Sequence, residues 1–196
     1  MKEILWHGRG GQGAFTAAKI LGAAYSLQGN YALAFPSFGP ERRGAPILSF
    51  TKLDSKAIGD RSQIKKADYV IYLDDTLFSS KAFDELKDKG KIFLNTKKSL
   101  SQLAQDFTNF DEEAVVPFDA EKIAYEVLGL PVTNTVMLSL LVKETSLLSE
   151  ESLLQAIKEY LPAKISEKIF VWLKRFFLQK EEVYETLSER EKSRFF

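Results

Sequence analysis

A glycine-rich turn close to the amino terminus constrains this chain most. It follows an apolar run at residues 4–6 and precedes an alanine-rich segment that begins at Ala14. Glycines let the backbone turn sharply and approach a ligand closely. A helix after such a turn presents unpaired N–H groups and the positive end of its dipole. We therefore expect an anion-binding site made by Gly8, Arg9, Gly10, Gly11, Gln12 and Gly13.

The glycine spacing also matches the dinucleotide fingerprint G-x-G-x-x-G. NAD binding normally needs an acidic residue at the end of the second strand, where it holds the ribose hydroxyls. The second strand predicted here, residues 31–35, has no carboxylate and runs into Pro36. A Walker A loop is excluded because its Lys and Ser/Thr are missing after Gly13. The turn thus favours an anion other than NAD, and the alternative is a turn that only permits close helix–sheet packing.

A second loop, residues 36–46, holds three prolines and two glycines and so reads as a stiff connection. It carries Arg42 and Arg43, which join Arg9 as candidate cationic partners for a phosphate or carboxylate. Contact with carboxylates of another subunit is an equal alternative, and solvent exposure is a third. Gln12 can donate to a phosphate or orient a group of a neighbouring subunit, although turn amides often do neither.

Apolar periodicity and turn residues predict an α/β fold. Strands are expected at residues 3–7, 31–35, 47–53, 69–73, 91–95 and 114–118, and helices at 14–28, 79–89, 100–107, between Asp119 and Gly129, and at 134–147, 149–160 and 163–187. The first two strands and their helix read as a βαβ unit. We expect a Rossmann-like open, mostly parallel sheet with helices on both faces. Residues 1–147 form this domain, and residues 148–196 form a helical C-terminal extension packed on it.

Composition narrows the chemistry. The 27 basic and 27 acidic residues balance, so net charge gives no reason to expect a nucleic acid, although residues 34–66 are mainly basic and residues 106–126 mainly acidic. That asymmetry fits a face made for an anion or an acidic partner, or two solvated faces. Without cysteine the chain has no thiol nucleophile and no cysteine ligand for an iron–sulfur cluster. His7 alone builds no zinc site, and no complete catalytic set is present.

We expect neither a signal peptide nor a membrane-spanning segment from the sequence. The chain enters a strand almost at once, which leaves no room for a signal peptide. Its longest apolar run, residues 136–142, is too short to cross a bilayer. We expect a cytoplasmic protein.

Two blocks carry a resemblance to a known family. The first is residues 7–13, His-Gly-Arg-Gly-Gly-Gln-Gly, and the second is residues 38–46, Phe-Gly-Pro-Glu-Arg-Arg-Gly-Ala-Pro. Together with Asp68–Ile71 and Asn134-Thr135 they resemble the gamma subunit of 2-oxoacid:ferredoxin oxidoreductases, in the form typical of the pyruvate and 2-oxoisovalerate type. The resemblance covers roughly residues 1–155. One departure is Ser139, where the family usually has glycine.

The resemblance implies a subunit that is inactive alone. In this family the assembled enzyme oxidatively decarboxylates a 2-oxoacid to an acyl-CoA and passes electrons to ferredoxin or flavodoxin. Thiamine diphosphate and iron–sulfur clusters lie on partner subunits of the alpha, beta and delta types. For the gamma chain the resemblance implies a domain that helps close the active site and bind coenzyme A. A stand-alone NAD(P)-binding oxidoreductase and a purely structural interface subunit are the rival readings.

Overall fold

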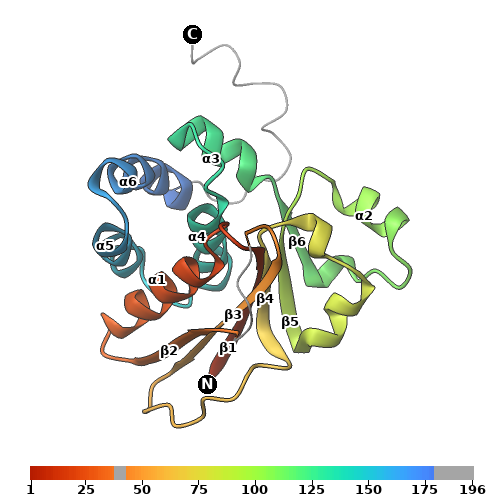
Figure 1. Cartoon of the computed structure of the whole chain (residues 1–196), viewed down its shortest axis with the longest axis horizontal. Coiled ribbons are helices and arrows are strands. Elements are labelled where there is room, and N and C mark those ends of the chain that lie inside the picture. Colours follow the sequence, from red (N-terminus) through yellow and green to blue (C-terminus); the bar gives the residue numbers. More distant parts are fainter. Residues whose placement is uncertain (38–42, 179–196) are drawn as a thin grey trace.

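Six strands form one mixed sheet in the computed structural model, which describes residues 1–37 and 43–178 (Figure 1). The order across the sheet is β2–β3–β1–β4–β5–β6. The strands are β1 (Lys2–Arg9), β2 (Tyr31–Pro36), β3 (Pro46–Asp54), β4 (Ala67–Tyr72), β5 (Leu86–Asn95) and β6 (Val115–Phe118). β1, β4, β5 and β6 run parallel, whereas β3 is antiparallel to both β1 and β2. The predicted open and mostly parallel α/β sheet is confirmed.

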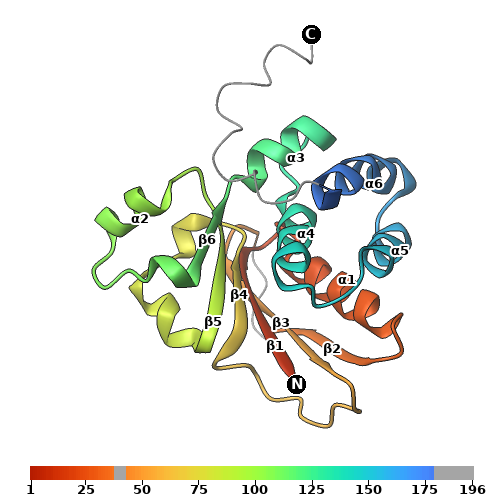
Figure 2. The same ribbon diagram turned by 180° about the vertical axis from the view of Figure 1, so that it is seen from behind.

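Helices cover both faces of this sheet (Figures 1 and 2). The α-helices are α1 (Ala14–Ser26), α2 (Leu100–Asp106), α3 (Ala120–Leu128), α4 (Thr133–Thr145), α5 (Glu150–Tyr160) and α6 (Ala163–Leu178), and the short 3-10 helices are η1 (Asp75–Leu77), η2 (Ser80–Glu85) and η3 (Glu112–Ala114). Helices α1 and α3–α6 lie on one side, and α2 and η2 lie on the other. Each side has its own apolar core.

The alternation of β1 explains the two cores, because successive side chains of a strand point to opposite faces. Ile4 and Trp6 are fully buried against α1 and the C-terminal helices. Leu5 packs on the other side, where Phe78 and Leu103 also lie.

The predicted βαβ unit has an inserted strand. Helix α1 leads from β1 to β2, but β3 lies between these two strands and pairs with both, over registers such as Leu5↔Phe50 and Phe35↔Phe50. The chain after β2 turns back through the stiff loop and returns beside β1. The nearest neighbour of β1 on this side is therefore antiparallel.

The helix predicted over residues 79–89 is wrong. Only Ser80–Glu85 forms a 3-10 helix, and β5 begins at Leu86. Within the 3-10 helix Ala82 is buried, and Phe78 just before it is buried in the same apolar core. Gly90 is a strand position at which a Cβ would lie 3.0 Å from Lys87 O and 3.2 Å from Ala67 O. It permits close strand contact and does not stop a helix.

Helices α3 and α5 both begin at residues whose side chains cap them. The Asp119 side chain accepts from Lys122 N at the start of α3, which ends at Gly129 with φ 72°. Ser149 accepts from Ser152 N at the start of α5. Helix α6 is described to Leu178, so the predicted continuation to residue 187 lies outside the described residues.

The C-terminal helices share the core of the sheet domain. Leu153, Ile157 and Leu173 are buried in the cluster that includes α1 and α4. The domain boundary after residue 147 stays a prediction. Within the described ranges no single helix is long and apolar enough to cross a membrane; α3 and α4 pass that criterion only as a pair bent by 116°.

Candidate functional site

The two sequence motifs are hydrogen-bonded to each other at the carboxyl end of β1. Gly10 N donates to Ala45 O over 2.8 Å, and Gly44 N donates to Gly10 O over 3.0 Å. These bonds continue the β1–β3 ladder, whose last pair is Arg9↔Pro46. The end of the proline-stiffened loop is thus fixed beside the glycine turn.

The glycine turn is held from inside by its own glutamine. Gln12 Oε1 accepts from Arg9 N at 2.7 Å, and Gln12 N donates to Arg9 O at 2.9 Å. Gln12 Nε2 donates to Asp74 Oδ2 at 3.0 Å, which ties the turn to the end of β4. The amide of Gln12 is therefore committed to the shape of the turn.

Arg9 makes a second connection to the same end of β4. Its Nε donates to Asp74 Oδ2 at 3.0 Å, its Nη2 to Thr76 Oγ1 at 2.7 Å and its Nη1 to Gly44 O at 3.1 Å. All three guanidinium nitrogens thus have acceptors within the chain, although the side chain is 34% exposed. In this structure Arg9 connects the glycine turn, η1 and the end of the stiff loop at residues 36–46, which we call the arginine loop.

Asp74 is the carboxylate at the centre of this network. Its Oδ1 accepts from Thr76 N at 3.1 Å and from the Thr76 hydroxyl. Burial by itself raises the pKa of Asp74, but the hydrogen bonds from Thr76 and Gln12 and the charge of Arg9 outweigh it and leave the pKa lowered. Asp74 therefore stays ionised and balances the charge of Arg9.

The turn presents backbone to solvent at its tip and receives a distant side chain at its end. Gly11 is exposed with φ 98° and has no neighbouring atom where a Cβ would stand. Gly13 caps α1 with φ 78° and no side-chain cap, and Asn134 Nδ2 donates to its carbonyl at 3.1 Å. A Cβ on Gly13 would lie 2.5 Å from that amide nitrogen. Glycine at position 13 is required by both geometry and space.

Of the predicted cations in the stiff loop, Arg43 is described and Arg42 lies outside the described residues. Arg43 is exposed and directly precedes Gly44, which is bonded to the glycine turn. No hydrogen bond or ion pair to the Arg43 side chain is found in residues 1–37 and 43–178. The backbone pairing therefore ties the residue after Arg43 to the glycine turn that precedes α1.

Sequence reasoning missed Asp74, Thr76 and Asn134 as parts of the site. Asp74 was visible as an acid at the end of a central strand, where open α/β sheets bind ligands. Asn134 gave no local signal, because it lies 121 residues from the glycine that it contacts.

His7 faces away from the glycine turn, on the opposite side of the sheet. Its Nε2 lies 2.8 Å from Glu85 Oε2, and its ring stacks on Tyr72 with centroids 4.2 Å apart. Tyr72 Oη also donates to Glu85 Oε2 at 3.1 Å. Burial first, and then the nearby Glu85, raises the pKa of Tyr72, so the phenol stays protonated. The cluster fastens η2 to the sheet.

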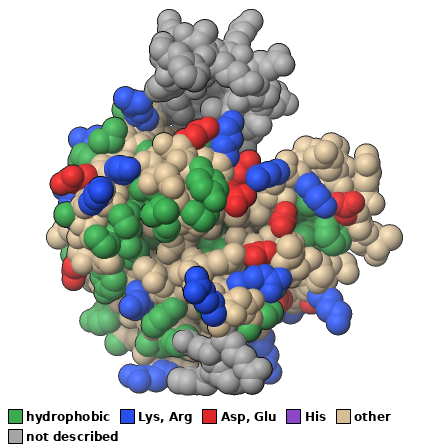
Figure 3. Space-filling model, turned by 45° about the horizontal axis from the view of Figure 1, so that its top comes forward, with side chains coloured by type: hydrophobic (Ala, Val, Ile, Leu, Met, Phe, Trp, Pro, Cys, Tyr) green, Lys and Arg blue, Asp and Glu red, His purple; other side chains and the backbone are tan. Residues whose placement is uncertain are grey.

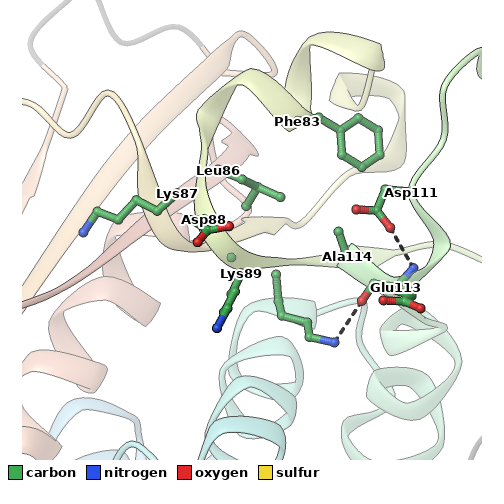
Figure 4. A pocket seen from close by; sticks show the side chains of 10 residues that line it. Phe83, Leu86, Lys87, Asp88, Lys89, Asp111, Glu113 and Ala114 are labelled. Carbon is green, nitrogen blue, oxygen red and sulfur yellow. Dashed lines mark hydrogen bonds between the residues drawn. The ribbon is translucent and has the colours of Figure 1, made fainter.

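A cavity of about 500 Å³ lies near the amino end of β5, between η2 and η3 (Figure 4). Phe83 and Leu86 give it apolar walls, and Asp111 and Glu113 add acids. Lys87 points away from it and pairs instead with Glu3 and Asp68. The described residues contain no group of three or more His, Cys, Asp or Glu side chains that could hold a metal ion.

The face seen from the carboxyl ends of the strands has no uniform charge. Figure 3 shows hydrophobic side chains gathered on one side of it, and basic and acidic side chains interspersed on the other. Val171 of α6 and Tyr160 of α5 are among the exposed apolar side chains of the chain, at 57% and 40% exposure.

Comparison with known proteins identifies the family of the chain. The family model of pyruvate ferredoxin/flavodoxin oxidoreductase matches residues 3–171. The pyruvate synthase subunit PorC of Methanothermobacter thermautotrophicus is 46% identical over 169 residues, which cover 86% of this chain and 89% of that protein. The common gamma subunit of the pyruvate/ketoisovalerate oxidoreductases of Pyrococcus furiosus is 43% identical over 169 residues, covering 86% and 91%.

A solved structure has the same fold. The pyruvate oxidoreductase subunit PORC of Thermotoga maritima superposes with a TM-score of 0.76 at 30% identity, covering 91% of this chain and 97% of that one. The chain belongs to the pyruvate ferredoxin/flavodoxin oxidoreductase family, as a gamma subunit of the multi-subunit 2-oxoacid:ferredoxin oxidoreductase.

Proposed function

We propose that the glycine turn and the arginine loop bind phosphate groups of coenzyme A in the assembled enzyme. The observation that carries this proposal is the pair of backbone hydrogen bonds between Gly10 and residues 44–45, which ties the segment directly after Arg43 to the glycine turn. Backbone N–H groups at a helix start and a guanidinium are the donors that phosphates prefer. Arg42 belongs to the same proposed site.

The described residues fit such a group. Gly13 starts α1 without a side-chain cap, which leaves the first-turn amides to an external acceptor. Gly11 is exposed with free space where a side chain would stand, so a phosphate can approach the backbone there. The charge of Asp74 is balanced by Arg9 and does not repel the ligand. Arg9 and Gln12 hold the turn in the shape that binds, and Gly8 and Gly10 form its backbone.

The wider assignment follows the family. The enzyme converts a 2-oxoacid such as pyruvate to an acyl-CoA, with electrons passed to ferredoxin or flavodoxin. The chain has no cysteine to ligate an iron–sulfur cluster, so we assign the clusters to alpha-, beta- and delta-type partner subunits. We assign thiamine diphosphate to the same partners from the resemblance to the family. We place this chain in the cytoplasm and expect it to be inactive alone. Residues 1–147 form the domain that closes the active site. Residues 148–196 form an extension on that domain.

Two observations weigh against the rival NAD(P) function. The end of β2 has no carboxylate for the ribose hydroxyls. In addition, β3 occupies the place beside β1 that the second strand of a dinucleotide-binding unit would take. Titration of the isolated chain with NADH, followed by cofactor fluorescence, separates the two functions, since saturable binding supports the dehydrogenase.

The direct test is steady-state kinetics of the assembled enzyme with Arg43→Ala and with Arg42→Ala. Loss of a hydrogen bond to a charged group costs about 1.5–3 kcal/mol. We expect the KM for coenzyme A to rise roughly 10- to 100-fold with kcat for the 2-oxoacid little changed, as for uniform binding energy.

Arg175→Ala is the matched control, because Arg175 is an exposed arginine on α6, and among the described residues the hydrogen bonds of the glycine turn involve no residue of that helix. The proposal fails if neither loop variant changes the KM for coenzyme A by more than the control does. That outcome leaves a purely structural role for the turn at a subunit interface.

A further inference from the structure

The connection between β3 and β4, residues 55–66, forms a basic loop at the amino ends of β1 and β4, the opposite end of β1 from the glycine turn. It begins after Asp54, which pairs with Tyr31 in the ladder, and ends at the first residue of β4. Four of its side chains are exposed cations: Lys56, Arg61, Lys65 and Lys66.

The acids close to this loop are already neutralised. Asp60 Oδ2 lies 2.5 Å from Lys52 Nζ, and Asp54 Oδ2 lies 3.2 Å from the amino group of Met1. The hydrogen bond from Lys52 is the main reason why the pKa of Asp60 is lowered, so Asp60 stays ionised and engaged.

A lysine–carboxylate network beneath the loop is balanced in the same way. Glu3 pairs with Lys52 at 3.6 Å and with Lys87 at 2.8 Å. Asp68 pairs with Lys87 at 2.8 Å and with Lys2 at 3.0 Å. Lys2, Lys52 and Lys87 thus neutralise Glu3, Asp60 and Asp68, and none of these three acids pairs with a cation of the loop.

The four loop cations have no such partners. Across the described ranges, the side chains of Lys56, Arg61, Lys65 and Lys66 make no hydrogen bond or ion pair. The loop is nevertheless fixed, because Ile64 is buried in the core beneath it and Asp60 Oδ1 accepts from Ser62 N at 2.9 Å. Four unpaired positive charges on an anchored loop attract an acidic surface and steer its approach.

We propose that this basic loop docks an acidic protein surface on another subunit of the oxidoreductase. The chain is a subunit of a multi-subunit enzyme, so a protein partner exists by membership. The loop has no aromatic residue on which a nucleic-acid base could stack. None of the exposed large hydrophobic side chains lies in residues 55–66, which leaves no anchor for a membrane.

The docking role is independent of the coenzyme A proposal. The basic loop lies at the amino ends of β1 and β4, and the glycine turn lies at the carboxyl end of β1. A partner on the loop therefore leaves the proposed phosphate site open, and the two proposals fail by different measurements.

The test compares two charge reversals of equal size in the full chain. Lys65→Glu with Lys66→Glu changes the loop, and Lys164→Glu with Lys168→Glu changes exposed lysines of α6. Each variant is bound to the remaining purified subunits at low and at high salt. At low salt we expect the association rate of the loop variant to fall at least about 10-fold below wild type. The association rate of this variant should also lose most of its dependence on salt. The association rate of the α6 variant should change less than about 2-fold.

Carbodiimide cross-linking of the assembled enzyme supplies a second readout. A zero-length cross-link from Lys65 or Lys66 to an Asp or Glu of another subunit supports the proposal. Equal association rates for the two variants, or no such cross-link, would overturn it. So would retention of RNA or of phosphatidylserine vesicles by the wild-type chain that the loop variant abolishes, because the acidic partner would then not be a protein.

Discussion

Gly13 shows at the scale of one residue how a distant part of the chain shapes the candidate site. Its backbone is left-handed, and Asn134 lies so close that a Cβ has no room. Gly11 also has a positive φ but stands in open space. An alanine at position 11 would add backbone strain alone, whereas an alanine at position 13 would add strain and a clash with Asn134.

Gly13→Ala should lower the free energy of unfolding by about 2–4 kcal/mol, because it adds left-handed strain and displaces the Asn134 hydrogen bond. Gly11→Ala should cost only the strain, about 1–2 kcal/mol. Urea unfolding of the full chain measures both values. Equal losses would show that Asn134 moves aside freely and does not hold the turn.

The pH dependence of Asp74 is a second residue-scale prediction. A carboxyl group whose pKa is lowered in the folded state contributes stability above its unfolded pKa, about 3.9. That contribution is lost as the pH falls through the folded pKa. Asp74→Asn should therefore cost about 1–2 kcal/mol at pH 7, with solvent screening taken into account, and the difference from wild type should close below about pH 4.

Unfolding curves between pH 3 and pH 7 test this, with Asp84→Asn as control. Asp84 is exposed, and among the described residues it makes no hydrogen bond or ion pair. A deficit of Asp74→Asn that stays constant down to pH 3 would mean that the carboxylate charge is not what holds Arg9 and Gln12.

At the scale of elements, β3 is the strand that departs from the predicted βαβ unit. It carries Lys52, which is fully buried although its Nζ reaches Asp60 and Glu3. A buried ion pair is often replaced by an apolar side chain without loss of stability, whereas removal of one partner leaves a buried charge. β3 therefore depends on the acids around Lys52 more than on the lysine itself.

Lys52→Met should leave the free energy of unfolding within about 1 kcal/mol of wild type, or raise it. Glu3 keeps its contact with Lys87 in that variant. Asp60→Asn should destabilise the chain, because the Lys52 ammonium loses its nearest carboxylate. Thermal unfolding of the two variants gives the ranking, and the reverse order would contradict this account of β3.

Prediction from sequence succeeded where the signal was local. The apolar run of β1, the glycine turn, α1 and the Asp119 cap depend on neighbours within a few residues, and the structure has each of them. The insertion of β3 depends on pairing between distant segments, which periodicity does not report. The helix predicted at 79–89 fails for the same reason, because β5 begins at Leu86 and its place is set by pairing with the distant strand β4.

The same limit applies to the candidate site. The motif blocks were visible, but the bonds of Arg9 to Asp74 and Thr76 join residues 65 and 67 positions apart. Sequence reasoning named Arg9 and Gln12 but not Asp74 or Thr76, and it could not show that the Arg9 and Gln12 side chains hold the turn. Among residues 1–37 and 43–178 the Arg43 side chain has no hydrogen bond or ion pair.

At the scale of the whole molecule, the chain presents two different ends. The carboxyl end of β1 carries the glycine turn bonded to residues 44–45, and the amino ends of β1 and β4 carry the basic loop at residues 55–66. We propose that the first end faces coenzyme A and that the second faces a partner subunit. The first of these proposals is the central claim.

Hydrogen exchange of the assembled enzyme with and without coenzyme A tests that claim most directly. If coenzyme A phosphates bind the turn, amides of residues 8–16 and 43–45 should exchange more slowly when it is present, because backbone N–H groups donate to the ligand. The exchange of residues 55–66 should not change. Unaltered exchange at residues 8–16 and 43–45 at saturating coenzyme A would contradict the account.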